Sequence, residues 1–388
     1  MDRQHRVIVP GSALGVFGGG QLGRMFAHAA QRLGYRVVVF TDEQNSPAGQ
    51  VAQETILGDY LDPKAIRTFA EKVDVITLEF ENIAIEAVAR AAEVTLVRPG
   101  VGVLAVAQHR LKEKRTLKDF GYPVTPFREI RSIQDISPAA EVLGWPLVLK
   151  TTNWGYDGKG QRRVSNQIEA NDAIELLGPE PLIAEQWIAY QAEVSVIVAR
   201  TANGATAVYP MFTNSHSNHV LDITTCPAEP ALHSVAIRAE SIAVGVAESL
   251  QLEGILCVEF FVGFDGELMI NEIAPRPHNS GHLTIEACRT SQFEQQVRAI
   301  CNLPLGDTSL IQPAAMANLL GDVWGSQSPR FERALEESGT YLHLYGKESA
   351  RQGRKMGHIT KLSETASKAA KEVIAIREAI RSSEATLF

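Results

Sequence analysis

The chain has 388 residues, of which 45% are hydrophobic, and a formal net charge of −8. This composition predicts a soluble globular protein of two or three domains and argues against a general nucleic-acid binder. No apolar run approaches the ~20 residues of a membrane span, and the N-terminus lacks the apolar core of a signal peptide. Four scattered cysteines without C-x-x-C spacing favour a reducing cytoplasm over a disulfide framework or a structural zinc site.

The first hundred residues alternate between strand and helix patterns. Strands are predicted at "ALGVF", "YRVVVF", "VDVITLEF" and "VTLVRPG". Between the second and third, Asp62 is a predicted N-cap with Pro63 at the first helical position. This alternation predicts a parallel sheet with right-handed crossovers that ends near residue 105.

A glycine motif follows the first predicted strand. In "VFGGGQLGRM", Gly18, Gly20 and Gly23 fit the G-x-G-x-x-G spacing of a dinucleotide fingerprint, and Asp42 lies near the position of a ribose-binding acid. An NAD-dependent oxidoreductase is therefore one interpretation.

The middle of the chain carries a second glycine-rich stretch. A basic amphipathic helix at "QHRLKEKRTLKDFG" precedes the strand "WPLVLK", which leads into "GYDGKGQ" at 155–161. Glycine N–H groups there, with Lys150 and Lys159, would suit phosphate oxygens, although an ordinary mobile loop is equally compatible. The stretch is not a Walker P-loop. A hairpin is predicted in "EVSVIVARTANGATAVYP", with its turn at Asn203 and Gly204.

Two carboxylates pair in a predicted hairpin, "VEFFVGFDGELMINE". A two-residue Asp265-Gly266 turn would place Glu259 directly opposite Glu272. Their repulsion would be relieved by a divalent cation such as Mg²⁺ or Mn²⁺; a solvated pair at a sheet edge is the alternative. In an ideal ladder Asn271 points to the opposite face, so its participation needs a twist or an end of the strand.

Two later segments are candidates for binding anions. Arg276, His278 and Asn279 in "APRPHNSGH" would suit a small planar oxyanion such as bicarbonate. "YGKESARQGRKMGH" is a basic cluster that would suit a phosphate. A surface loop and a solvated basic loop are the respective alternatives.

Together these motifs resemble a known family in their order and spacing. "GGGQLGRM", "TLEFENI", "GYDGKGQ", "AEQWI", "EVSVIVAR", "NEIAPRPHNSGH" and "GRKMGH" resemble the ATP-grasp 5-(carboxyamino)imidazole ribonucleotide synthetases of purine biosynthesis. The resemblance implies a carbon–nitrogen ligase. Its ATP would phosphorylate bicarbonate, and the resulting carboxyphosphate, or CO₂ released from it, would carboxylate aminoimidazole ribonucleotide to give ADP and phosphate.

The resemblance also implies a role for each matching residue. Glu259 and Glu272, with Asn271, would hold the metal, and bicarbonate would meet Arg276, His278 and Asn279. ATP and its metal would contact Arg110, Lys150, Gly155, Tyr156, Asp157, Gly158, Lys159, Gly160, Gln161, Glu185, Gln186, Trp187, Ile188, Glu193, His216, Asn271 and Glu272. Tyr156 and Asp157 would also face the imidazole amine. The ribonucleotide would contact Gln21, Leu22, either Glu79 or Glu81, and Lys347 and Arg354. In this family the first glycine turn helps to bind the ribonucleotide rather than NAD.

The implied fold combines α/β and α+β parts. An N-terminal parallel-sheet domain is expected at 1–108, an ATP-grasp domain at 109–305 with a mobile subdomain at about 125–190, and a C-terminal subdomain at 306–388. A cytoplasmic homodimer that hands its product to a downstream mutase is also expected, without nucleic-acid or membrane partners. Competing interpretations are a formate-dependent glycinamide ribonucleotide transformylase, a biotin carboxylase, the NAD-dependent oxidoreductase and a non-catalytic nucleotide-binding regulator.

Overall fold

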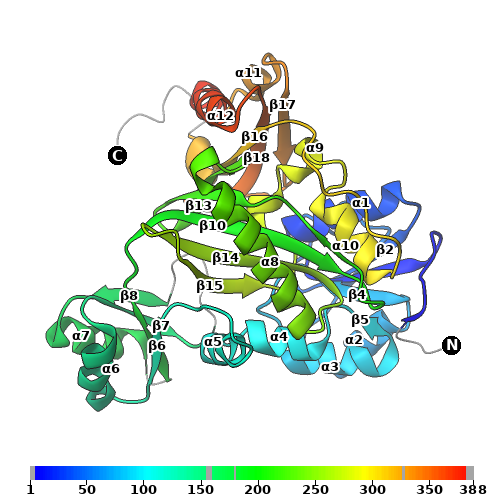
Figure 1. Cartoon of the computed structure of the whole chain (residues 1–388). Helices are drawn as coiled ribbons and strands as arrows, with labels where there is room; N and C mark the ends of the chain where they lie inside the picture. The colour runs from blue at the N-terminus through cyan, green and yellow to red at the C-terminus, as the bar shows by residue number, and fades with distance from the viewer. Residues whose placement is uncertain (1–4, 154–159, 179–180, 326–327, 382–388) are drawn as a thin grey trace.

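The described part of the chain is built around three β-sheets (Figure 1). The computed structural model describes residues 5–153, 160–178, 181–325 and 328–381. No helix within these ranges is both long enough and apolar enough to cross a bilayer.

The first sheet is parallel, as the sequence predicts, with strand order β3-β2-β1-β4-β5. Its last strand is shorter than expected and covers two residues of "VTLVRPG". Asp62 caps its helix as predicted, accepting a hydrogen bond from the backbone N–H of Lys64. The strands are β1 (Ala13–Phe17), β2 (Arg36–Thr41), β3 (Glu54–Leu57), β4 (Val75–Leu78) and β5 (Leu96–Val97); the helices are α1 (Gln21–Arg32), α2 (Pro63–Ala70) and α3 (Ile85–Val94).

Two further helices lead out of this sheet, α4 (Val101–Ala107) and α5 (Arg110–Asp119). The second occupies the predicted basic helix, but two of its charged residues, Glu113 and Lys114, are buried. Charged side chains are rarely buried without partners. The burial therefore marks a structural contact that the charge pattern does not reveal.

A small antiparallel sheet stands apart from the others at the lower left of Figure 1. Its order is β6-β9-β7-β8, and its apolar residues pack against two helices. The strands are β6 (Phe127–Ile130), β7 (Leu147–Thr151), β8 (Gln161–Val164) and β9 (Leu182–Gln186); the helices are α6 (Ile136–Leu143) and α7 (Gln167–Leu177).

The third sheet has nine strands in the order β15-β14-β10-β12-β13-β16-β18-β17, with β11 paired to β10. Helix α8 (His233–Ser249) packs on one part of it, and α12 (Ala366–Ile380) on another. The strands are β10 (Tyr190–Arg200), β11 (Thr206–Val208), β12 (Phe212–Ser217), β13 (Val220–Cys226), β14 (Gly254–Gly263), β15 (Leu268–Ala274), β16 (Ala314–Leu320), β17 (Thr340–Leu344) and β18 (Lys355–Leu362).

Strands from both sides of residue 306 share this sheet, because β13 pairs with β16. The hairpin predicted in residues 193–210 forms from β10 and β11. Its loop holds Ala202 as well as the predicted Asn203 and Gly204, because Thr201 and Ala205 close it, and Gly204 has a positive φ of 86°. The remaining α-helices of the described residues are α9 (Thr284–Ala287), α10 (Gln292–Ile300) and α11 (Phe331–Leu335). Residues of α10 join the apolar core of the first sheet and also that of the nine-stranded sheet, so this helix attaches the two larger sheets to each other.

Candidate active site

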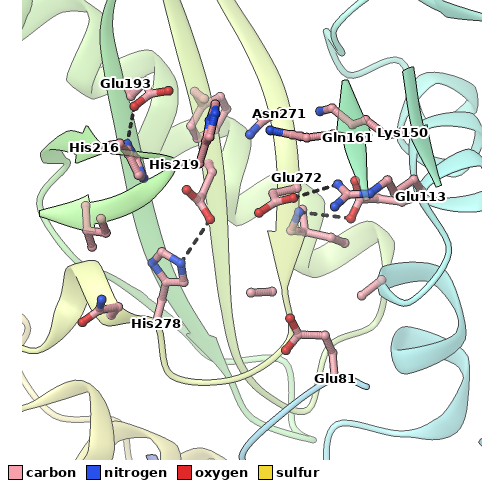
Figure 2. Close-up of a pocket in the computed structure, with 18 of the residues that line it drawn as sticks. Glu81, Glu113, Lys150, Gln161, Glu193, His216, His219, Asn271, Glu272 and His278 are labelled. Atoms are coloured by element: carbon pink, nitrogen blue, oxygen red, sulfur yellow. Dashed lines mark hydrogen bonds and ion pairs between the residues drawn. The ribbon is translucent and has the colours of Figure 1, made fainter. Parts of the chain in front are cut away.

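One large cavity, of about 980 Å³, is lined by residues from the first sheet, the small sheet and the nine-stranded sheet. Figure 2 shows side chains from these parts of the chain facing one another across it. Nineteen of the predicted site residues line it: Gln21, Leu22, Glu79, Glu81, Arg110, Lys150, Gln161, Glu185, Gln186, Trp187, Ile188, Glu193, His216, Glu259, Asn271, Glu272, Arg276, His278 and Asn279.

The remaining predicted residues fall into two groups. Gly160, Lys347 and Arg354 are described but are not among the residues that line the cavity. The other five lie outside the described residues: Gly155, Tyr156, Asp157, Gly158 and Lys159. Their roles stay predictions.

Glu259 and Glu272 pair across β14 and β15, as predicted, but through a different turn. The loop has three residues rather than two, because Gly263 and Glu267 close it and Gly266 takes a positive φ of 79°. A bulge at Asn271 then shifts the register by one residue. The two departures cancel at the glutamates.

The bulge also answers the question of Asn271. Successive residues of a regular strand point to opposite faces, but Asn271 and Glu272 both line the cavity (Figure 2). The sequence indicated that Asn271 could share a face with Glu272 only if the strand were irregular there. The extra residue in β15 is that irregularity. Figure 2 shows Asn271 directed toward the region of Gln161 and Lys150.

Each glutamate of the pair has a basic neighbour. Glu259 Oε1 lies 3.1 Å from Nε2 of His278, and Glu272 Oε2 accepts a hydrogen bond from Nη1 of Arg110 at 3.1 Å. Burial raises the pKa of Glu259, but His278 outweighs this and lowers it to about 2. Burial likewise opposes the charge on His278, but Cys257 and Glu259 raise its pKa to about 10. Glu259 is therefore ionised at neutral pH.

These residues fit a hard divalent cation. Two carboxylates and an amide supply the oxygen ligands that Mg²⁺ prefers, and Oδ1 of Asn271 is buried without a hydrogen-bond partner among the described residues. Among the described residues, no group of three or more His, Cys, Asp or Glu side chains is arranged to hold a metal. A cation here would therefore need other oxygen ligands, such as water or phosphate.

The small sheet and α5 contribute a buried charge cluster beside the glutamates. Nζ of Lys150 donates to Oε2 of Glu185 at 2.7 Å, and Nζ of Lys114 lies 3.8 Å from Oε1 of the same residue. Burial raises the pKa of Glu185, but Lys114 and Lys150 outweigh this and lower it to about 2. The carboxylate therefore holds Lys150, which lines the cavity, in place.

Glu113 is a cavity residue that the sequence did not single out. Its Oε2 accepts a hydrogen bond from the backbone N–H of Ile273, next to Glu272, at 3.2 Å. Burial raises its pKa to about 8, although neighbouring Lys114 opposes this. A single acid inside a basic helix gives little sequence signal, because its partner lies 160 residues away.

Strands β10 and β12 supply another pair of charged side chains in the cavity. His216 Nδ1 and Glu193 Oε2 form an ion pair at the upper left of Figure 2. Burial lowers the pKa of His216, but the hydrogen bond to Glu193 outweighs it, and the net shift is upward. Both residues line the cavity. The guanidinium of Arg163 lies 4.7 Å from the ring centroid of Trp187, in the predicted adenine linker.

The two acids that the sequence left unassigned differ in their partners. The Glu79 carboxylate accepts hydrogen bonds from the backbone N–H groups of Gly20 and, at 2.9 Å, Gly23. Glu81 pairs with Arg276, whose Nη2 donates to Oε1 at 2.8 Å. Both acids line the cavity.

The first of these contacts bears on the dinucleotide interpretation. The N–H groups that would meet a pyrophosphate at the start of α1 already bind the carboxylate of Glu79. Asp42, the predicted ribose acid, is exposed and is not among the residues that line the cavity. The geometry therefore does not favour NAD at the fingerprint.

The C-terminal basic cluster reaches the cavity through Lys355. Nζ of Lys347 donates to the backbone carbonyl of Lys355 at 2.7 Å, and Arg354 donates to Ser349. Burial, with Arg354 next, lowers the pKa of Lys347 to about 8. Lys355 belongs to the cluster seen in the sequence, but charge alone did not single it out.

Comparison with known proteins gives the family. The chain matches models of the ribonucleotide synthetase preATP-grasp domain at 12–108, the ATP-grasp domain at 115–293 and the phosphoribosylaminoimidazole carboxylase C-terminal domain at 314–372. It is 42% identical over 355 residues to the N5-carboxyaminoimidazole ribonucleotide synthase of Bacillus subtilis (strain 168), covering 92% of each chain. The chain belongs to this synthase family.

Solved structures of the synthase family agree with that assignment. A Staphylococcus aureus N5-carboxyaminoimidazole synthetase complexed with ADP has a TM-score of 0.90, is 36% identical, and the match covers 97% of this chain and 100% of that one. An Aspergillus clavatus synthase in complex with ADP and 5-aminoimidazole ribonucleotide has a TM-score of 0.87, is 32% identical, and the match covers 95% and 99%. The predicted ATP-grasp fold, with its N-terminal parallel sheet, is confirmed.

Proposed function

We propose that this chain carboxylates 5-aminoimidazole ribonucleotide with ATP and bicarbonate, in purine biosynthesis. The γ-phosphoryl group of ATP passes to a bicarbonate oxygen and gives ADP and carboxyphosphate. The exocyclic amine then forms a bond to the carboxyl carbon, either of carboxyphosphate or of CO₂ released from it. Phosphate leaves and the amine loses one proton, which balances the formation of 5-(carboxyamino)imidazole ribonucleotide.

One observation carries the proposal: the paired glutamates line the same cavity as the residues expected to bind ATP and those expected to bind the ribonucleotide. Lys150, Gln186 and Glu193 line it on the side of the small sheet and β10, where ATP is expected. Glu79 and Lys355 line it near the fingerprint turn and the basic cluster, where the ribonucleotide is expected. A phosphoryl group and an amine bound in one enclosure are held close enough to react without release of a labile anhydride.

Magnesium is the metal that the oxygen donors fit best. Glu259, Glu272 and Asn271 would hold it, and when bound it neutralises phosphate charge. Glu259 is ionised over the whole neutral range because its pKa is about 2. Arg110 donates to Glu272 and so orients that carboxylate toward the cavity.

Arg276, His278 and Asn279 are proposed to bind bicarbonate and carboxyphosphate. Arg276 is oriented by Glu81, and His278 is charged because its pKa is about 10. Both polar atoms of the Asn279 side chain are buried without hydrogen-bond partners among the described residues. Cationic and amide donors fixed around one oxyanion stabilise the charge that develops on it.

Asp157 is proposed to orient the substrate amine or to accept its proton, with Tyr156 beside it. Both lie outside the described residues. Asp157→Asn keeps the shape of the side chain but removes its basicity, so we expect carboxylation to slow by about 10²-fold, with bicarbonate-dependent ATP cleavage less affected. Parallel assays of ADP and of ribonucleotide loss measure both steps, and full carboxylation by this variant would contradict the role.

The experiment for the proposed function follows ADP formation with Mg-ATP and bicarbonate, with and without aminoimidazole ribonucleotide. ADP formation matched to loss of the ribonucleotide supports the proposal. ADP formation without carboxylation would point to a different acceptor, and formate in place of bicarbonate identifies the transformylase chemistry. Absence of ADP under both conditions would overturn the proposal, and titration with NAD would then test the fingerprint.

Three expectations from the sequence stay predictions: the homodimer, the cytoplasmic location and transfer of the product to a mutase. Light scattering of the purified chain measures the first. Addition of the mutase measures the third, because direct transfer would shorten the lag before its product appears.

A further inference from the structure

A chain of polar side chains runs from His278 into the interior of the nine-stranded sheet. Nδ1 of His278 lies 2.8 Å from Oγ of Ser280, to which Oγ of Ser195 donates at 2.8 Å. Nδ2 of Asn214 donates to Oγ of Ser195 at 2.9 Å. Oγ1 of Thr224 donates to Oδ1 of Asn214 at 3.1 Å. The chain thus joins the loop after β15 to strands β10, β12 and β13.

The four residues beyond His278 are buried behind the cavity wall and do not line the cavity. Ser195, Thr224 and Ser280 have 0% exposed surface and Asn214 has 7%, and none of the four is among the residues that line the cavity. Buried polar groups destabilise a fold when they lack partners. This chain satisfies its members in one continuous path that ends at a cavity residue.

The path engages one ring nitrogen of His278, and Glu259 engages the other, with Nε2 3.1 Å from Oε1. An imidazole held at both nitrogens has its ring plane fixed. A serine hydroxyl can donate or accept, so Ser280 can serve either protonation state of the ring. What the path determines is the direction of the ring rather than its charge.

We propose that Ser195 and Asn214 are positioning residues for His278. They hold Ser280, which holds the imidazole against Glu259 at the place where bicarbonate is to bind. The inference rests on the proposed function, because it takes His278 as part of the bicarbonate site. Loss of either residue leaves the substrate contacts chemically intact but removes support from Ser280, so the imidazole is held less firmly in its direction.

Ser195→Ala tests the chain at its centre. We expect kcat/KM for bicarbonate to fall about tenfold, because the path from Ser195 ends at His278. KM for ATP should be unchanged, because the path reaches none of the residues expected to contact ATP. Thr213→Val is the matched control: its hydroxyl lies on β12 beside Asn214 and is buried without a partner among the described residues. A general packing defect would affect both variants, whereas loss of positioning affects the first alone.

A double-mutant cycle with His278→Ala separates positioning from structure. If Ser195 acts through His278, Ser195→Ala will cost little further in the His278→Ala background. An equal fold-loss in both backgrounds would overturn the inference. Where Ser195→Ala does not fold, the isosteric Thr224→Val tests the far end of the chain; a smaller loss of the same kind is expected, and none would contradict the inference.

The same cycle separates failure of the inference from failure of the proposed function. A His278→Ala enzyme with normal bicarbonate kinetics would overturn the role of His278 and the inference with it. A damaged His278→Ala enzyme, together with a Ser195→Ala enzyme that behaves like Thr213→Val, would overturn the inference alone.

Discussion

The carboxylate of Glu259 has two charged neighbours: Glu272 repels it and His278 attracts it. It opposes Glu272 across the strand pair and lies 3.1 Å from His278. Glu259→Gln removes the charge from both relationships, so we expect ADP formation to fall by about two orders of magnitude. The measurement is kcat over a titration of Mg²⁺.

Glu267→Gln is the control for this variant. Glu267 lies at the exposed tip of the same hairpin, so the same chemical change there should leave kcat within about twofold. Equal losses from the two substitutions would mean that the charge of the hairpin matters and not the site at Glu259.

Lys347 predicts a pH dependence. Burial and Arg354 lower its pKa from 10.5 to about 8, so its positive charge is present at pH 7 and is lost as pH rises through 8. If Lys347 binds the ribonucleotide phosphate, KM for that substrate will rise about tenfold between pH 7 and pH 9. Lys347→Arg should flatten the profile, because a guanidinium stays charged; coincident profiles for the two enzymes would contradict the assignment.

At the scale of elements, the hairpin β14–β15 shows what the sequence could and could not specify. Alternation and a turn signal predicted the pairing of Glu259 with Glu272. They could not specify a three-residue loop or the bulge at Asn271, because a turn and a bulge shift the register equally and oppositely. The pairing was predicted correctly from a turn that was wrong.

The loop makes a prediction of its own. Gly266 has a φ of 79°, where a side chain is strained, while Gly102 in α4 has open space around a prospective Cβ. Gly266→Ala should reduce the free energy of unfolding by about 1 kcal/mol with KM for ATP unchanged. Gly102→Ala should instead be neutral or slightly stabilising. Chemical denaturation of both variants measures the two changes in the free energy of unfolding. A Gly266→Ala variant as stable as the Gly102→Ala variant would contradict the strain expected at the positive φ of Gly266.

Contacts between distant elements mark the limit of prediction from this one sequence. The motifs were informative about the cavity, because nineteen of the residues predicted from them line it. They did not distinguish Glu79, which binds the turn before α1, from Glu81, which binds Arg276 on a loop 195 residues away. Nor could they reveal Glu113 or the chain of polar side chains that leads from His278 into the nine-stranded sheet. Such pairings follow from the packing of elements and leave no local periodicity in the chain.

At the scale of the whole molecule, the nine-stranded sheet spans the predicted boundary at residue 306. β13 pairs with β16, and α12 packs across both. A fragment of residues 1–305 would expose the edge of β13 and the apolar face that α12 covers. We therefore expect it to aggregate or to unfold without a cooperative transition in thermal circular dichroism. A cooperative melt of the fragment would instead support the C-terminal part as a separable domain.

The same sheet has a consequence for the choice of substrate. Glu259 lies on β14 and Lys355 on β18, with the hydrogen-bonded strands β10, β12, β13 and β16 between them, so one continuous sheet sets how far the paired acids lie from the basic end of the cavity. The small sheet is not part of this path, so the separation does not depend on it. If the proposed function holds, this sheet sets the distance between the metal and phosphoryl end of the cavity and the end that takes the ribonucleotide phosphate. An acceptor that is too short or too long for that distance could bind at one end but could not react at the other.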